Sequence, residues 1–167
     1  MKTMLKLFSL LLISLLISCG GKDEKKKESF SYEKKTTTEA KTPVKTEMVP
    51  ASAKVDLTNK GIGPISSLEL NAEIDQAMVA HGQEVYNKMC TACHRPNKKF
   101  IGPAQAGVME RRTPEWIMNM ILNPEEMLQK DPLAKELLAE FNGAPMANQN
   151  LTQEEARAVL EYFRTLK

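Results

Sequence analysis

The chain has 167 residues, and its 23 lysines and arginines nearly balance 21 aspartates and glutamates, which leaves a formal net charge of +2. Proteins that bind nucleic acid concentrate basic side chains on one surface, so this balance excludes nucleic acid as the expected partner. The cysteines are three, an odd number, and two of them, Cys90 and Cys93, lie too close together to join distant segments. A small disulfide-stabilised scaffold is therefore excluded as well.

The first residues have the layout of a secretory signal. A basic start over residues 1–6 precedes an almost wholly apolar stretch over residues 7–17, which is shorter than the roughly 20 residues of a membrane-spanning helix. The stretch ends in Leu16-Ile17-Ser18-Cys19-Gly20, which resembles a bacterial lipoprotein signal. We therefore predict a signal peptide over residues 1–18, lipid on Cys19, and export to the periplasmic side of an inner or outer membrane. A plain signal peptide and an uncleaved anchor remain alternatives.

Residues 19–56 differ sharply in composition from the rest of the chain. Lysine, glutamate and threonine dominate and large apolar residues are scarce, so the segment buries too little surface to offset the entropy of ordering it. We predict a disordered tether ahead of a folded domain over residues 57–167, whose core spans residues 75–167. A polybasic lipid-binding patch is the alternative, although acidic residues dilute the lysines.

The expected fold class is all-α, because helical patterns recur in the domain and no alternating strand pattern of useful length appears. Apolar residues at helical spacing predict a helix over residues 72–89. After a loop over residues 95–108, prolines in first-turn positions predict helices over residues 114–122 and 132–141. Thr152 and Glu155 form a capping-box pattern at the start of a last helix. A domain of about 100 residues needs help with its core, which a bound cofactor would supply.

The strongest chemical signal is Cys90-Thr91-Ala92-Cys93-His94, a C-x-x-C-H pattern. Its two thiols can add to the two vinyl groups of a porphyrin, and the adjacent histidine is then held beneath the ring to ligate iron. The pattern predicts one haem c attached through Cys90 and Cys93, with His94 on the iron. A thioredoxin-like pair lacks its βαβ context, a zinc site lacks a fourth ligand, and an inert disulfide leaves His94 unexplained.

With this motif, residues 75–167 resemble the class I c-type cytochromes. Gly82 and Tyr86 stand eight and four residues before Cys90, where that family has a glycine and an aromatic residue on its first helix. The resemblance implies that this helix crosses the last one closely, with Gly82 meeting Tyr162. Both residues imply packing rather than chemistry.

The resemblance also implies two residues around the haem. The carbonyl of Pro103 would accept the ring N–H of His94 and raise its basicity, although Pro103 also fits an ordinary turn. Trp116, the one tryptophan, would pack near the haem edge, where its indole N–H suits a propionate. A simple core tryptophan is the competing interpretation.

A distal ligand is expected from one of the ten methionines. Met146 lies in an irregular stretch shortly before the last helix, and from this position the family presents its distal methionine. Here Pro145 precedes Met146, whereas the family commonly has proline after the methionine. Met109 and Met127, which are expected in turns, therefore stay open as alternatives.

Two strong-field ligands leave no open iron position, so electron transfer is expected rather than catalysis, and the chain is predicted not to be an enzyme. The expected partners are a quinol-oxidising complex and a terminal oxidase or reductase. Basic residues near the motif serve either solvation or docking to an acidic partner: Lys88, Arg95, Lys98 and Lys99. The rival function is a haem-based ligand sensor or a peroxidase-like protein whose methionine is displaced.

Overall fold

The computed structural model describes residues 49–167. The predicted signal peptide, the lipid on Cys19 and most of the predicted tether lie outside the described residues. Within them the chain forms helices and, outside the helices, one isolated parallel bridge between Asp56 and Arg112, which confirms the all-α prediction. The helices are α2 (Gln76–Met89), α3 (Val108–Arg111), α4 (Pro114–Leu122), α5 (Pro124–Lys130), α6 (Pro132–Glu140) and α7 (Gln153–Phe163). Over residues 49–167, no helix combines the length and the apolar character needed to cross a membrane.

Helix α2 begins later than predicted. The carboxylate of Asp75 accepts the backbone N–H groups of Ala77 and Met78, at 2.9 and 3.0 Å. These bonds make Asp75 the N-cap, because they satisfy amide groups that have no partner within the helix. The predicted start at residue 72 is therefore wrong, since the capping aspartate carries more weight than the apolar spacing.

Three consecutive helices begin with a proline, and this rule also explains a helix that the sequence prediction missed. Pro114, Pro124 and Pro132 each occupy the first turn of α4, α5 and α6, where a missing N–H costs nothing. The sequence analysis predicted no helix between residues 122 and 132. Pro124 starts α5 there, so Met127 is helical rather than in a turn. Met109 is likewise helical, within the single turn of α3.

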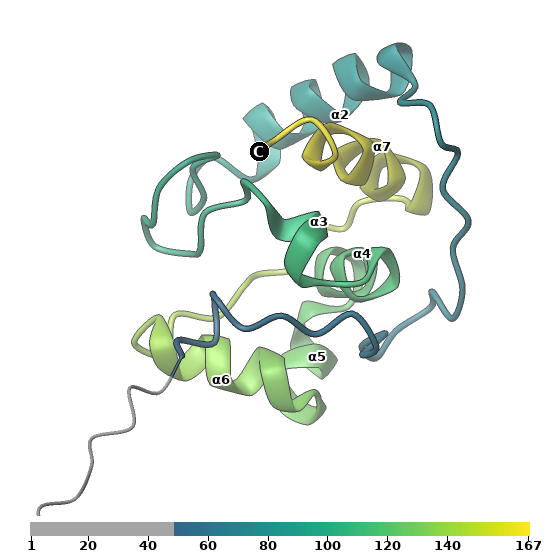
Figure 1. The fold of residues 1–167 in the computed structure, drawn as a ribbon. Helices are drawn as coiled ribbons and strands as arrows, with labels where there is room; N and C mark the ends of the chain where they lie inside the picture. The colour runs from purple at the N-terminus through teal and green to yellow at the C-terminus, as the bar shows by residue number, and fades with distance from the viewer. Residues whose placement is uncertain (1–48) are drawn as a thin grey trace, which may run out of the picture. The chain divides into compact units, whose positions relative to one another are not determined.

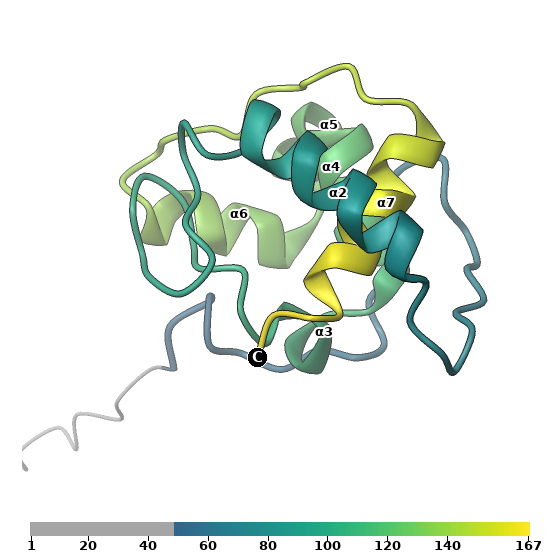
Figure 2. The same cartoon turned by 90° about the horizontal axis from the view of Figure 1, so that it is seen from above.

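Helices α2 and α7 cross in close contact, in both views of the domain (Figures 1 and 2). A Cβ added at Gly82 would lie 1.9 Å from the carbonyl oxygen of Ala158 and 2.9 Å from the nitrogen of Val159. The predicted crossing at Gly82 is confirmed, but its predicted partner is wrong. Gly82 meets the backbone of Ala158, while Tyr162, one turn later, packs against Tyr86 with ring centroids 5.4 Å apart. Only a residue without a side chain allows the two backbones to approach so closely.

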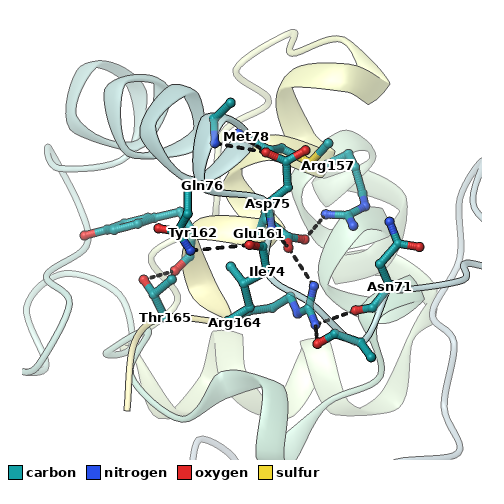
Figure 3. Close-up of polar contacts among 12 residues, drawn as sticks. Asn71, Ile74, Asp75, Gln76, Met78, Arg157, Glu161, Tyr162, Arg164 and Thr165 are labelled. Carbon is teal, nitrogen blue, oxygen red and sulfur yellow. Dashed lines mark hydrogen bonds and ion pairs between the residues drawn. The ribbon is translucent and has the colours of Figure 1, made fainter.

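A buried carboxylate fastens the same pair of helices (Figure 3). Glu161 of α7 is 1% exposed and is flanked by Arg157 and Arg164, whose guanidinium nitrogens lie 2.5 and 2.6 Å from its two oxygens. It also accepts the backbone N–H of Asp75, the cap of α2, at 3.1 Å. Arg164 donates to the carbonyl of Asn71, so the network reaches the chain ahead of α2.

Residues 49–70, here called the strap, lead from beside α6 to the start of α2 (Figure 1). Ala51 is buried, and Ser52 donates from its backbone and its hydroxyl to Glu140 of α6. Asn119 of α4 donates to the carbonyls of Lys60 and Ile65, both at 2.9 Å. Packing thus begins ahead of residue 57, the predicted start of the domain, because Glu140 of α6 and the buried Asn119 of α4 form hydrogen bonds with the strap.

Candidate haem site

One cavity brings the predicted site residues together. Its lining includes Cys90, Cys93, His94, Pro103, Trp116 and Met146. The rest of the wall is largely apolar, and Ile117 of α4, Leu137 of α6 and Val159 of α7 are examples. The side chains that can bind a metal therefore lie on the wall of a largely apolar cavity.

The thiols sit at the end of α2. Cys90 is the C-cap of the helix, and its carbonyl accepts the backbone N–H groups of Cys93 and His94, at 3.1 and 2.9 Å. This turn keeps all three side chains on the cavity. No disulfide joins Cys90 to Cys93, and burial, together with the neighbouring Cys93, raises the pKa of the Cys90 thiol to about 11. Among residues 49–167 no three His, Cys, Asp or Glu side chains converge on one point, so the zinc alternative finds no ligand set there.

The imidazole of His94 is fixed from two sides. A Cβ added at Gly102 would lie 2.4 Å from Cε1 of the ring, so the bare backbone of Gly102 packs directly against it. Nδ1 of His94 lies 3.0 Å from the carbonyl oxygen of Pro103. Burial lowers the pKa of His94, and the Pro103 contact opposes this only in part. A neutral ring that donates through Nδ1 keeps the lone pair on Nε2 for a metal.

Met146 faces the cavity from the segment between α6 and α7. The two alternative methionines do not line it. Met127 is 0% exposed, and its sulfur accepts the backbone N–H of Ile62 in the strap at 2.9 Å. Met89 and Met120 also line the cavity, but both belong to helices, α2 and α4. Met146 is the lining methionine that comes from a loop.

Trp116 lines the cavity but its indole N–H is engaged elsewhere. Nε1 donates to a carboxylate oxygen of Asp131 at 3.2 Å, and Asp131 is also the N-cap of α6. In this structure the partner of the indole N–H is thus a protein carboxylate, where the resemblance implied a propionate. The reason is tertiary, because the start of α6 packs against α4 at this tryptophan.

Several lining residues were missed by the sequence analysis. Arg112 is buried and donates to the carbonyls of Ala51, Lys54 and Arg111, while burial lowers the pKa of its guanidinium. Ser52, Gln105 and Arg111 also line the cavity. The adjacent arginines just before the cap of α4 were the available signal. Nothing in the sequence pointed to Ser52 or Gln105.

The residues present fit a covalently attached haem. Two free thiols, a neutral imidazole and a thioether share one apolar-walled cavity. Tyr86 lines the same cavity, and its hydroxyl is a buried polar atom without a hydrogen-bond partner, which a bound group in the cavity would be placed to complete. Burial raises the pKa of this hydroxyl to about 12, so it remains a neutral donor.

Comparison with known proteins gives one consistent result. Residues 79–167 match the family model described as cytochrome c. Over 81 residues the chain is 35% identical to cytochrome c2 of Rhodocyclus tenuis, covering 48% of this chain and 85% of that protein.

Solved structures agree. A cytochrome c from Rhodothermus marinus superimposes with a TM-score of 0.59 at 45% identity, covering 61% of this chain and 87% of the other. An engineered cytochrome c from the same organism, described as bound to a carbene intermediate, gives a TM-score of 0.57 at 44% identity, with 61% and 88% covered. The chain belongs to the cytochrome c family of electron-transfer haem proteins, and it carries one haem c attached through Cys90 and Cys93.

Proposed function

We propose that this chain is a monohaem electron carrier, lipid-anchored outside the cytoplasm, in which His94 and Met146 would bind the iron. The supporting observation is that an imidazole and a loop thioether line one cavity together with both thiols. When bound, the haem supplies a metal centre that gains and loses a single electron. Two protein ligands leave no position for a substrate, so the site favours electron transfer over catalysis.

The chain's own residues explain how the site would keep its geometry during turnover. Gly102 and Pro103 hold the His94 ring, so the imidazole needs no rearrangement when the charge on the iron changes. Apolar side chains from α4 and α7 line the cavity, where they would limit the access of water to a bound haem. A thioether ligand such as Met146 stabilises ferrous iron more than a second imidazole ligand would. It therefore raises the midpoint potential of the haem.

Absorption spectra of the mature holoprotein test this assignment. A weak near-infrared band in the ferric state, together with a low-spin ferrous spectrum, is the expected result for nitrogen and sulfur ligation. A five-coordinate resting iron would contradict the proposed ligand pair. A mature mass without an added haem at the two cysteines would contradict the attachment.

A ligand-binding role is the second candidate, and one observation favours it. Within the part of the chain that the structure describes, hydrogen bonds from residues 145–151 stay local. Gln149 donates to the carbonyl of Ala147, and the backbone N–H of Asn150 donates to the side chain of Asn148. Met146 and Leu151 pack against the core, but these hydrogen bonds do not tie the loop to another element, so release of Met146 would break none of them to a distant segment. Carbon monoxide binding to the reduced native protein would favour a sensor or peroxidase-like role, whereas no binding favours the carrier.

The mouth of the cavity supports docking to an acidic redox partner. Phe100 and Ile101 are each 47% exposed, and Ile101 also lines the cavity. The guanidinium of Arg95 lies 4.2 Å from the ring centroid of Phe100, and the ammonium of Lys99 lies 4.4 Å from that of Phe141. An apolar centre with cations around it suits a partner that has carboxylates around its own apolar contact. A quinol-oxidising complex and a terminal oxidase or reductase remain the proposed partners.

The proposed anchor has a direct test. Replacement of Cys19 by serine removes the thiol that would carry the lipid, so the protein should move from the membrane fraction to the soluble periplasmic fraction. Its haem spectrum should not change. A Cys19→Ser protein that stays with the membrane would contradict the lipid anchor and leave the haem assignment untouched.

A further inference from the structure

Asp131 is a buried carboxylate behind the wall of the haem cavity. It is 2% exposed at the start of α6, and its Oδ1 accepts the indole N–H of Trp116 at 3.2 Å and the backbone N–H of Ala134 at 2.8 Å. Its Oδ2 accepts the side-chain amide of Asn59, in the strap, at 2.7 Å. Trp116 lines the cavity, so a single indole ring lies between this carboxylate and the space that the haem fills.

The hydrogen-bond partners of Asp131 favour its charged form. An indole N–H and a backbone N–H can only donate. The amide of Asn59 is oriented as a donor too, because its Oδ1 accepts the backbone N–H of Gly61 at 2.8 Å, which turns its NH₂ group towards Asp131. Three donors thus meet the two oxygens of the carboxyl group, and such bonds are stronger to a carboxylate than to a carboxylic acid. The group therefore places a negative charge behind the cavity wall.

A buried cation lies near the same tryptophan without forming an ion pair with Asp131. The guanidinium of Arg112 lines the cavity and lies 5.4 Å from the ring centroid of Trp116. Burial and the charge of Arg111 lower the pKa of Arg112, and the charge of Asp131 acts against this shift. The ion pairs among residues 49–167 do not include one between Arg112 and Asp131, so neither charge is neutralised by direct contact with the other.

The charge of Asp131 should act on a haem in the cavity. Ferric haem carries one positive charge more than ferrous haem, so a negative charge nearby stabilises the ferric state. Buried side chains screen such a charge far less than water does. The carboxylate therefore favours oxidation of the haem.

We propose that Asp131 is a positioning residue that holds the indole of Trp116 on the cavity wall and, through its charge, lowers the midpoint potential of the bound haem. The inference goes beyond the proposed function, because it requires a haem in the cavity but not Met146 on the iron. It also gives Trp116 a role different from the one that the resemblance implied. The indole N–H binds a carboxylate of the protein rather than a propionate of the haem.

Asp131→Asn in the holoprotein separates the charge from the hydrogen bond to the indole. The amide oxygen of the new side chain can still accept the indole N–H, but the negative charge is gone. The ferrous-to-ferric ratio at a fixed ambient potential should therefore rise by roughly three- to tenfold. Asn59→Ala is the matched control, because it removes the bond between Asp131 and the strap and leaves the charge in place, so the ratio should not change. Glu125→Gln removes an exposed carboxylate of α5, which water screens, and should change the ratio much less.

The indole proton gives a second readout, independent of the potential. Trp116 is the one tryptophan, so its indole N–H resonance in the reduced holoprotein is unambiguous. Asp131→Asn should move this resonance upfield, because a neutral amide oxygen is a weaker acceptor than a carboxylate. Trp116→Phe tests the charge in the opposite direction. It removes one donor to Asp131 and keeps the carboxylate, so the ferrous-to-ferric ratio should fall.

An unchanged or lowered ratio in Asp131→Asn would overturn the proposal, and so would a raised ratio in Trp116→Phe. An equal rise in Asn59→Ala would assign the effect to a loosened strap and would overturn it too. An indole resonance that does not respond to Asp131→Asn would mean that the indole N–H binds another group when the haem is present. The absorption spectrum of the unmodified protein tests the axial ligands separately, so a failure of the proposed ligand pair is distinguishable from a failure of the role of Asp131.

Discussion

At the scale of single residues, the proposed ligand pair and the helix crossing each depend on one residue. Met146 is exposed to the cavity from a loop, whereas Met127 is fixed in the core by the strap. Gly82 is the point where α2 touches the backbone of α7. Each of these positions predicts a different experimental signature.

Met146→Ala should open one axial position of the iron. We expect loss of the near-infrared band, binding of carbon monoxide to the reduced protein, and a lower midpoint potential, since the thioether favours the ferrous state. Met127→Leu is the control, because it removes a methionine outside the cavity at a cost of less than about 1.5 kcal/mol. If Met127→Leu changed the spectrum and Met146→Ala did not, the ligand assignment would be wrong.

Gly82→Ala should destabilise the fold even though alanine is the better helix former. The added methyl group would lie 1.9 Å from the carbonyl oxygen of Ala158, which belongs to backbone and cannot rotate away. Overpacking of this kind costs roughly 1–3 kcal/mol, and the gain of about 1 kcal/mol in helix propensity offsets only part of it. Urea unfolding of the holoprotein measures the difference. Gln83→Ala, at the exposed neighbouring position, should not be destabilised in the same assay.

At the scale of elements, the α2–α7 pair depends on the Glu161 network (Figure 3). Burial raises the pKa of the Glu161 carboxyl, but hydrogen bonds from Arg157 and Asp75 and the charges of Arg157 and Arg164 together lower it below its ordinary value of 4.5. A carboxyl whose pKa is lowered by folding stabilises the fold above its unfolded pKa. That contribution is lost as the pH falls through the lowered folded value.

Glu161→Gln should therefore lower the free energy of unfolding at neutral pH by about 1–3 kcal/mol, because two arginines lose their partner. Near pH 3 the difference from the unmodified protein should shrink, since the carboxyl is then increasingly protonated in both states. Urea unfolding at the two pH values measures both effects. Glu154→Gln, at an exposed position on the same helix, is the control. A difference that does not depend on pH would contradict the electrostatic explanation.

The strap is a second element with a testable attachment. The side chain of Asn119 forms hydrogen bonds with the strap backbone at two residues, Lys60 and Ile65. Its Oδ1 accepts the N–H of Ile65 at 2.9 Å, and its Nδ2 donates to the carbonyls of Lys60 and Ile65. Asn119→Ala leaves those backbone groups without partners, which costs roughly 1–3 kcal/mol. Hydrogen exchange of the Ile65 amide should accelerate more than that of the core amides in α7. Uniform acceleration would mean that the strap does not open separately.

At the scale of the whole molecule, the basic residues near the C-x-x-C-H motif should steer charged redox partners. Oxidation of the ferrous protein by ferricyanide, a small anion, should slow as salt is added, because salt screens the attraction. At low salt, the Lys98→Glu protein should be oxidised by ferricyanide more slowly than the unmodified protein, and its rate should depend less on salt. Lys135→Glu, the same change on exposed α6, should have a smaller effect. A rate that does not depend on salt would leave solvation as the role of these lysines.

Local sequence determined the features that depend on neighbouring residues. The C-x-x-C-H motif placed two thiols and an imidazole on one turn, because the spacing is set within a few residues. The capping box of Thr152 and Glu155 is present as predicted, and first-turn prolines set the starts of α4 and α6. In each case the interacting groups lie within one or two helical turns, so the chain needs no distant partner to specify them.

Tertiary structure alone decided the contacts between residues far apart in the sequence. It made Ala158 rather than Tyr162 the partner of Gly82, gave the indole of Trp116 to Asp131, and extended the packed chain back to Ala51. These outcomes depend on how α4, α6 and α7 pack, and a periodic pattern along the chain carries no information about which distant side chain it will meet. The position of Gln105 beside His94 has the same origin, because it arises only when the loop folds back over the imidazole.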